Sequence, residues 1–459
     1  MPAVSITPHP SPGRGLDAEV LAVLRWAWTA TPMANATVAA RARELLLDTL
    51  GCAIAGTAAP EVADLARQTA SVDPGPLGMP GLPCSLSTNA FASLFATAAC
   101  WHEACEGLAA AHGRPGLHAI PAALAPALLR AAPLGTLLDA VVAGYEVGGR
   151  LGMVCRIRPG MHVDGTWGSF AAATAAARML GASSDQAAAA LDHAACHMPF
   201  SLYWPIPAGS TARNTYAGHG ATHGLASAIA ALAGLGGPPG SIAEMARLAL
   251  GLDPGPMPPP GRWLLLDGYL KRYPAVRHVH YGALAAETWH AAAPPAFTPA
   301  FTPAFTPDTI TAIDLHIYDE ALTYCGNRAP ATAIQAQFSL TYGLAAALAH
   351  GRLGPASYTE AAMSDPLVRR LEALISLRPD PAMTAAGRRG CVLTVTSGDH
   401  VWRHQVDTVP GDPATPMDRA EIQAKFEAYA APVLGTRHAQ AIAVRLLDGP
   451  LDAPIHLGP

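Results

Sequence analysis

Residues 160–168, GMHVDGTWG, place a histidine among three glycines just before an Ala-rich stretch. Glycine allows the backbone to approach a ligand closely, and the N-terminus of a following helix favours an anion. Histidine is also the side chain whose unperturbed pKa, about 6.5, suits proton transfer near neutral pH. The stretch therefore indicates that His162 transfers a proton beside an anionic ligand. A histidine in an ordinary surface loop is the alternative.

The cysteines offer little metal or redox chemistry. The chain has eight of them, and they form no C-x-x-C motif. Cys100 and Cys105 are the only close pair, whereas zinc and iron–sulfur sites need more closely grouped ligands. A phosphate-binding glycine motif is also absent. We expect buried free thiols, and neither a metal nor an organic cofactor.

Composition limits the class of protein. A chain of 459 residues is too long for one ordinary core, and 51% hydrophobic residues argue against disorder. The formal net charge is −5, which argues against the basic surface that binds nucleic acid. Arg130 and Arg178 interrupt the longest apolar stretches before the ~20 residues of a membrane span, and the N-terminus lacks the order of a signal peptide. We expect a cytoplasmic protein without nucleic-acid or membrane partners.

The predicted secondary structure changes along the chain from helices alone to a mixture of helices and strands. Helical spacing and Ala-rich segments continue to about residue 265, which predicts a compact helical bundle. Residues 310–317 alternate apolar and polar types, and residues 392–406 resemble a β-hairpin, with helical patterns at 331–350 and 358–376 between them. The predicted fold is mainly α, with a large all-helical domain and a smaller α+β domain.

The same change sets the expected domain boundaries. We expect a helical domain over 1–266, an α+β domain over 267–415, and a C-terminal segment over 416–459 that returns to the helical domain. A helix is expected to begin near Asp418. Residues 296–307 repeat AFTP three times, and a proline at every fourth position excludes a regular helix or a central strand. We interpret this repeat as an extended surface linker.

Several stretches resemble the MmgE/PrpD family, in the family's order. They are 42–56, 95–128, 160–181, 210–234 with 269–286, and 324–351, and residues 409–426 resemble the family's ending. The most specific local match is 160–181, which resembles the motif His-Pro-Thr-Gly-Thr-x-Gly followed by a helix. The resemblance implies a helical domain with a smaller α+β lid, a pocket between them, a homodimer, and neither metal nor organic cofactor.

The resemblance also implies catalytic positions. They are Glu103, His162, Lys271, His280 and Tyr324. Lys271 is expected to bind a substrate carboxylate or act as an acid, and Tyr324 to donate a proton or only a hydrogen bond. His280 is either catalytic or structural. Glu103 is a base, a residue that orients a histidine, or a charge on a helix surface.

Three arginines are expected to bind substrate carboxylates. Arg213 stands where the family usually has lysine, and Arg114 where a histidine is usual. Arg277 follows Val276, which replaces a histidine that is catalytic in the decarboxylases of the family. Arginine keeps its proton and grips carboxylates with two parallel hydrogen bonds. His112, nearby in sequence, is also expected to bind the substrate. An ordinary surface arginine is the alternative for Arg213.

The expected activity follows from the family's reactions, which involve proton transfer at a carbon next to a carboxylate. The leading hypothesis is a metal-independent lyase that dehydrates or decarboxylates a small di- or tricarboxylate. An isomerase or epimerase on the same scaffold is the alternative. A second alternative is a non-catalytic partner subunit, although the survival of His162, Lys271 and Tyr324 weighs against it. We expect these three residues and Arg213 to converge on one pocket.

Overall fold

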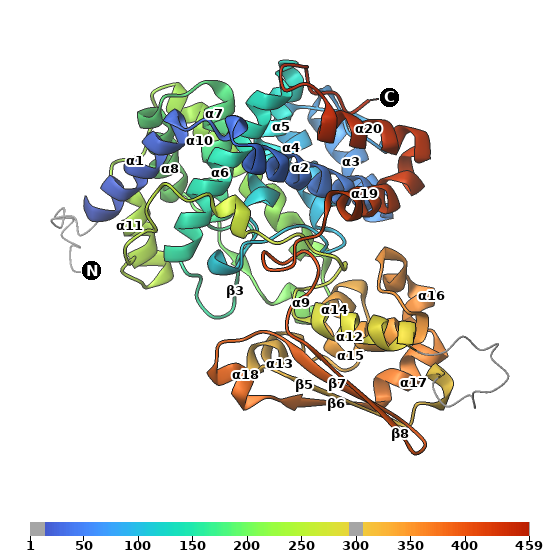
Figure 1. Cartoon of the computed structure of the whole chain (residues 1–459). Coiled ribbons are helices and arrows are strands. Elements are labelled where there is room, and N and C mark those ends of the chain that lie inside the picture. Colours follow the sequence, from blue (N-terminus) through green and yellow to red (C-terminus); the bar gives the residue numbers. More distant parts are fainter. Residues whose placement is uncertain (1–13, 293–305, 459) are drawn as a thin grey trace, which may run out of the picture.

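The computed structural model describes residues 14–292 and 306–458, which form a helical bundle and a smaller part that contains a sheet (Figure 1). The predicted fold class, mainly α with a smaller α+β part, is confirmed. Most of the AFTP repeat lies outside the described residues. Within the described residues no single helix is long and apolar enough to cross a membrane. The helices Ala36–Gly56 and Pro60–Val72 pass that test only as a pair, and the pair is bent by 91°.

The bundle contains two groups of helices, one on each side of the sheet-containing part in sequence. They are α1 (Arg14–Thr29), α2 (Ala36–Gly56), α3 (Pro60–Val72), α4 (Thr88–Cys100), α5 (Pro115–Leu129), α6 (Leu134–Val154), α7 (Gly168–Leu180), α8 (Ser184–Cys196), α9 (Pro205–Ala208), α10 (Tyr216–Leu232), α11 (Ser241–Met245), α19 (Arg419–Leu434) and α20 (Thr436–Asp448). Two short strand pairs complete it, β1 (Pro74–Gly78) with β2 (Ser85–Leu86) and β3 (Met161–His162) with β4 (Ser201–Leu202).

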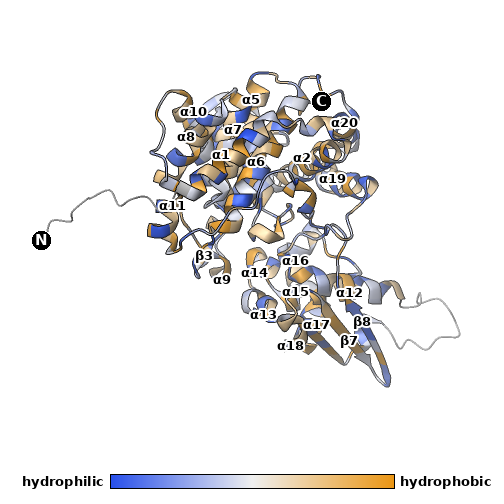
Figure 2. Cartoon of the chain, turned by 60° about the vertical axis from the view of Figure 1, so that its left-hand side comes forward, coloured by the Kyte–Doolittle hydropathy of each residue, from blue (hydrophilic) through white to orange (hydrophobic). Residues whose placement is uncertain are grey.

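Close helix packing in the bundle depends on small residues. Hydrophobic residues predominate along α6 and α7, which lie in its middle (Figure 2). A Cβ atom at Gly148 in α6 would lie 2.6 Å from the Cα of Ala171 in α7. A Cβ at Gly144 would lie 2.6 Å from the carbonyl oxygen of the same alanine. Glycine at these positions therefore sets how closely the two helices approach.

Within the described residues, the smaller part contains seven α-helices and a four-stranded sheet. The helices are α12 (Val279–Ala292), α13 (Asp319–Cys325), α14 (Ala333–Gln337), α15 (Leu340–His350), α16 (Glu360–Met363), α17 (Pro366–Leu374) and α18 (Pro381–Ala385). The strands are β5 (Ala312–Ile317), β6 (Ile375–Pro379), β7 (Cys391–Ser397) and β8 (His400–Val406), in the order β6-β5-β7-β8. Strand β6 runs parallel to β5, and the other neighbours are antiparallel.

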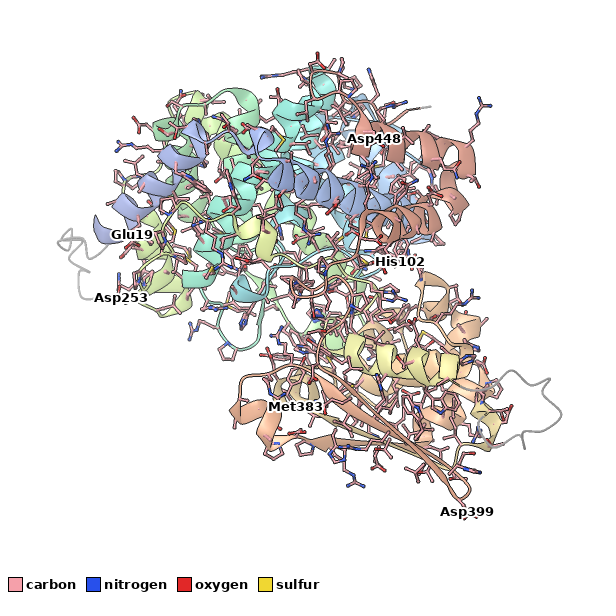
Figure 3. All side chains as sticks on the ribbon, in the orientation of Figure 1. Glu19, His102, Asp253, Met383, Asp399 and Asp448 are labelled. Carbon is pink, nitrogen blue, oxygen red and sulfur yellow. The ribbon has the colours of Figure 1, made fainter. Side chains whose placement is uncertain are left out.

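Local sequence signals predicted much of this sheet. In β5 the alternate residues Ile313, Leu315 and Ile317 are all buried, as the period of two requires. Strands β7 and β8 form the predicted hairpin, and Ser397 faces His400 across a two-residue turn. Asp399 lies at the outer tip of this hairpin, away from the bundle (Figure 3).

The predicted helices over 331–350 and 358–376 are each divided. Ser339 caps α15, and Asp365 caps α17, through side-chain oxygens that accept backbone N–H groups of the new helix. Such caps restart a helix in a new direction. The end of the second pattern is strand β6, which begins at Ile375 and pairs with a strand distant in sequence. Tertiary pairing therefore overrode the local helical pattern there.

Buried side chains form two separate hydrophobic cores. One lies in the bundle, and the other extends over residues from Tyr273 to Val409. Helices α19 and α20 follow the sheet in sequence but contribute to the core of the bundle. Asp418 caps α19 as expected, and the Nζ of Lys425 in this helix donates to Asp48 in α2 at 2.5 Å.

Candidate active site

A cavity of about 360 Å³ lies between the bundle and the smaller part. Eight of the nine predicted site residues line it. They are Glu103, His112, Arg114, His162, Arg213, Lys271, Arg277 and Tyr324. The ninth, His280, does not line the cavity.

The charge of the cavity is opposite to that of the chain. Seven cationic and three anionic side chains line the cavity, an excess of four positive charges, whereas the whole chain carries −5. The cations are Arg114, Arg156, Arg158, Arg213, Lys271, Arg277 and Arg389, and the anions are Glu103, Asp164 and Glu320. Aromatic rings, including those of Trp167 and Phe338, form much of the remaining wall. Such a lining favours a small anion with some apolar surface.

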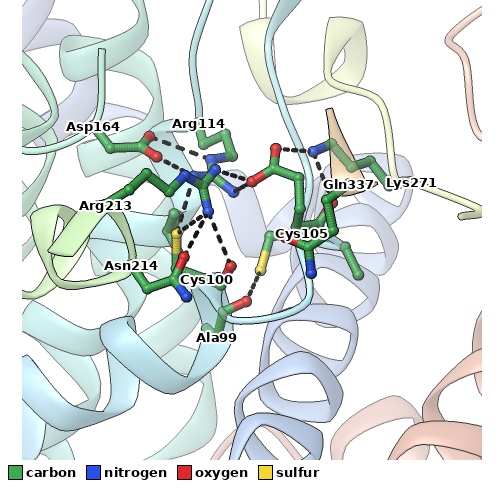
Figure 4. Close-up of polar contacts among 12 residues, drawn as sticks. Ala99, Cys100, Cys105, Arg114, Asp164, Arg213, Asn214, Lys271 and Gln337 are labelled. Carbon is green, nitrogen blue, oxygen red and sulfur yellow. Dashed lines mark hydrogen bonds and ion pairs between the residues drawn. The ribbon is translucent and has the colours of Figure 1, made fainter. Parts of the chain in front are cut away.

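A buried ionic cluster contains Arg114, Asp164, Arg213 and Lys271 (Figure 4). Glu103 is its centre, because it accepts from all three cations. It lies in the turn after α4, with a positive φ of 53°. Its Oε2 accepts from Arg114 Nη1 at 3.1 Å and from Arg213 Nη2, and its Oε1 accepts from Lys271 Nζ. Burial alone would raise the pKa of this carboxyl, but the three cations together hold it well below its usual value. Glu103 is therefore ionised, and it is not a charge on a helix surface.

Asp164 holds the guanidinium of Arg114. Arg114 Nε donates to Asp164 Oδ1 at 3.2 Å, and Nη2 donates to Oδ2. Burial raises the pKa of Asp164, but Arg114 and the neighbouring cations more than reverse that effect and lower it. The two-pronged face of Arg114 is thus occupied within the protein instead of facing a substrate. Asp164 was not among the predicted site residues, although it lies two residues after His162 in the same motif.

Arg213 is also bound within the protein. It lies in the 3-10 helix η3 (Thr211–Thr215) and is 1% exposed. Its Nη1 donates to the carbonyl oxygen of Cys100 at 3.2 Å and to Oδ1 of Asn214 at 3.1 Å. The ring of Phe338 lies 5.3 Å from its Cζ. Its Nε has no hydrogen-bond partner within residues 14–292 and 306–458.

His162 is held in one orientation by its surroundings. Strand β3, which contains it, pairs with β4, and its ring lies 6.4 Å from that of Tyr203 and 5.7 Å from that of Tyr216. Its Nδ1 accepts the backbone N–H of Asp164 at 3.1 Å, so the neutral ring carries its proton on Nε2. Burial lowers the pKa of His162 to about 4, although Asp164 opposes this effect. The ring is therefore neutral near pH 7.

His278, and not His280, lines the cavity together with His112 and His162. The Nδ1 of His278 lies 2.6 Å from the hydroxyl of Tyr318, and its ring stacks on that of Tyr324 at 6.4 Å. Burial, aided by Arg389, lowers the pKa of His278 to about 3. His280 faces the opposite way, with its Nε2 3.1 Å from the carbonyl oxygen of Ala275. The stretch RHVHYG contains both histidines, and residues two apart at a helix start point to opposite sides.

The remaining predicted residues lie on both sides of the cavity. Arg277 pairs with Asp412, and its Cζ lies 5.0 Å from the ring of Tyr269. Tyr324 in α13 is 48% exposed. His112 is an exposed residue at the end of the 3-10 helix η2 (Ala109–Ala111).

The described residues show no arrangement of ligands for a metal. In residues 14–292 and 306–458 no three His, Cys, Asp or Glu side chains are placed to bind one ion. Cys100 and Cys105 are buried, and the Sγ of Cys105 donates to the carbonyl oxygen of Ala99 at 2.9 Å.

Comparison with protein families agrees with the resemblance seen in the sequence. The model of the MmgE/PrpD N-terminal domain matches residues 26–251, and that of the MmgE/PrpD C-terminal domain matches residues 273–449. Together they cover nearly the whole chain. A search of the curated proteins finds no match.

Proposed function

Because the chain belongs to the MmgE/PrpD family, whose members are dehydratases and related enzymes, we propose that it is a lyase of small di- or tricarboxylic acids. The proposed reaction is dehydration or decarboxylation by proton transfer at a carbon next to a carboxylate. The observation that carries the proposal is the cavity with four excess positive charges and a neutral histidine on its wall. A cavity of about 360 Å³ suits a small acid.

His162 is proposed to transfer the proton. Its Nδ1 is taken by the N–H of Asp164, so Nε2 is the ring nitrogen left to meet a ligand in the cavity. A bound anion favours the imidazolium, because an opposite charge nearby raises the pKa of histidine. The protonated ring then donates its Nε2 proton to a departing hydroxyl group or to a carbanion.

A dehydration also needs a group that removes the proton from carbon. His278 is proposed for this task, because its Nδ1 is taken by the hydroxyl of Tyr318 and its Nε2 remains for the substrate. A bound anionic substrate would raise the pKa of His278 from its low value of about 3 and so make it a stronger base. Lys271 is buried and bonded to Glu103, and its pKa is lowered by burial. We propose that Glu103 orients Lys271 and the two arginines, since a carboxylate bound by three cations is a poor base.

Epimerisation is the second candidate. It needs one proton-transfer group on each side of a carbon atom. His162 comes from the bundle and His278 from the smaller part, so the two histidines approach the cavity from different domains.

The test is an NMR screen of di- and tricarboxylic acids in deuterated water, with His162→Gln as the control. A lyase produces an unsaturated acid or carbon dioxide. An epimerase exchanges a hydrogen of the acid for deuterium, and the acid loses neither water nor carbon dioxide. If no acid loses a group and none takes up deuterium, both proposals are contradicted. That result would favour a non-catalytic subunit.

A further inference from the structure

Asp164 presents two different partners to the same atom of His162. Its backbone N–H donates to His162 Nδ1 at 3.1 Å, and its carboxylate Oδ2 lies 3.8 Å from that atom. A neutral ring accepts the N–H, whereas a ring protonated on Nδ1 repels that N–H and needs an acceptor. At 3.8 Å the carboxylate of Asp164 is too far from Nδ1 to accept a hydrogen bond, so it would have to move toward the ring to act as this acceptor.

Arg114 controls whether that carboxylate is available. It binds both oxygens of Asp164 and is itself held by Glu103 at 3.1 Å. His118 fixes the same loop from α5, since its Nε2 accepts the N–H of Gly165 at 3.2 Å and its Nδ1 bonds the carbonyl oxygen of Arg114 at 3.0 Å. Asp164 therefore cannot shift independently of Arg114.

We propose that Arg114 and Asp164 act as one unit that positions His162 and decides whether its imidazole carries a proton. The inference rests on the proposed function only in assigning His162 to the reaction. The two side chains form a buried ion pair with each other, so a change in one alters the surroundings of the other.

The direction of control follows from the charges around the ring. Besides Arg114 and Asp164, the charged groups that act on His162 are Arg213 and Glu103. The loss of Arg114 removes a repelling cation and releases the carboxylate, so it favours the imidazolium. The loss of the Asp164 carboxylate removes the acceptor and favours the neutral ring.

The experiment is a histidine titration by NMR on the full chain with ¹⁵N-labelled histidine, in which His162→Gln assigns the signal. Wild-type His162 should be neutral at pH 7 with its proton on Nε2. Arg114→Gln should raise its titration midpoint by roughly one pH unit, and Asp164→Asn should lower it. Arg178→Gln is the matched control, because it breaks the remote ion pair with Asp139, and it should leave the midpoint unchanged.

Arg114→Lys tests the same step if Arg114→Gln does not fold. It keeps the charge next to Glu103 but loses the two-pronged grip on Asp164, so a smaller upward shift is expected. A wild-type proton on Nδ1, or an Arg114 variant that leaves the midpoint unchanged or lowers it, would overturn the inference. The titration needs no substrate, so it stands apart from the outcome of the acid screen.

Discussion

Glu103→Gln should destabilise the fold strongly, because it removes the carboxylate that three buried cations share. Asp164 would then be the remaining anion of the cluster, beside the three cations Arg114, Arg213 and Lys271. The cluster would therefore carry an excess of two buried positive charges. Removal of one partner from a buried ion pair typically costs about 3–5 kcal/mol. We expect a loss of that size in the free energy of unfolding at pH 7.

The variant should recover part of its stability as the pH rises. Burial already lowers the pKa of Lys271, and without Glu103 the folded protein would favour the neutral amine further. The unfolded chain then binds more protons than the folded one, so the stability of the variant increases with pH up to the unfolded lysine pKa of about 10.4. In the wild type, the pKa of Glu103 is lower in the folded protein than in the unfolded chain, where it is about 4.5. Ionised Glu103 therefore stabilises the fold above pH 4.5, and this stabilisation is lost as the pH falls toward the pKa in the folded protein.

The assay is urea denaturation followed by circular dichroism at pH 7 and pH 9. Glu320→Gln is the matched control, because its ion pair with Arg389 lines the same cavity but its side chain is 37% exposed. This control should cost at most about 1 kcal/mol. Glu103→Gln combined with Lys271→Met removes one excess charge and should be more stable than Glu103→Gln alone. A cost for Glu103→Gln no larger than that of the control would refute the reasoning.

Three further outcomes are expected. His162→Gln should reduce turnover of the substrate found in the screen by ~100- to 10,000-fold in steady-state assays, with an unchanged circular dichroism spectrum; near-normal turnover would contradict the assignment. Binding of tricarballylate at pH 7 should take up protons as His162 becomes charged, and calorimetry in buffers of different ionisation enthalpy would reveal it; heats independent of buffer would exclude it. Gly148→Ala should lower the free energy of unfolding by about 1–3 kcal/mol, because its Cβ would lie 2.6 Å from the Cα of Ala171. Gly15→Ala, which meets nothing within 4 Å in helix α1, is its control.

The sequence by itself determined the elements whose signals are local. The alternation in 310–317 predicted β5, and Gly398 with Asp399 predicted the turn between β7 and β8. Both depend on side-chain direction and turn chemistry within a few residues. Eight of the nine site residues predicted from the family motifs line the cavity, but Asp164 and His278, which also line it, were not predicted.

The tertiary structure alone decided how those residues are used. Whether His278 or His280 reaches the cavity depends on the rotation of a helix start, and spacing in the sequence does not show it. Arg114 was expected to bind a substrate, but its guanidinium is bound by Asp164, 50 residues away in sequence. Charges act over distances in space, so the partner of a buried ion is set by how loops from separate elements pack together. The sequence therefore specifies which charged groups are present, and the fold determines which of them neutralise one another and which remain for a ligand.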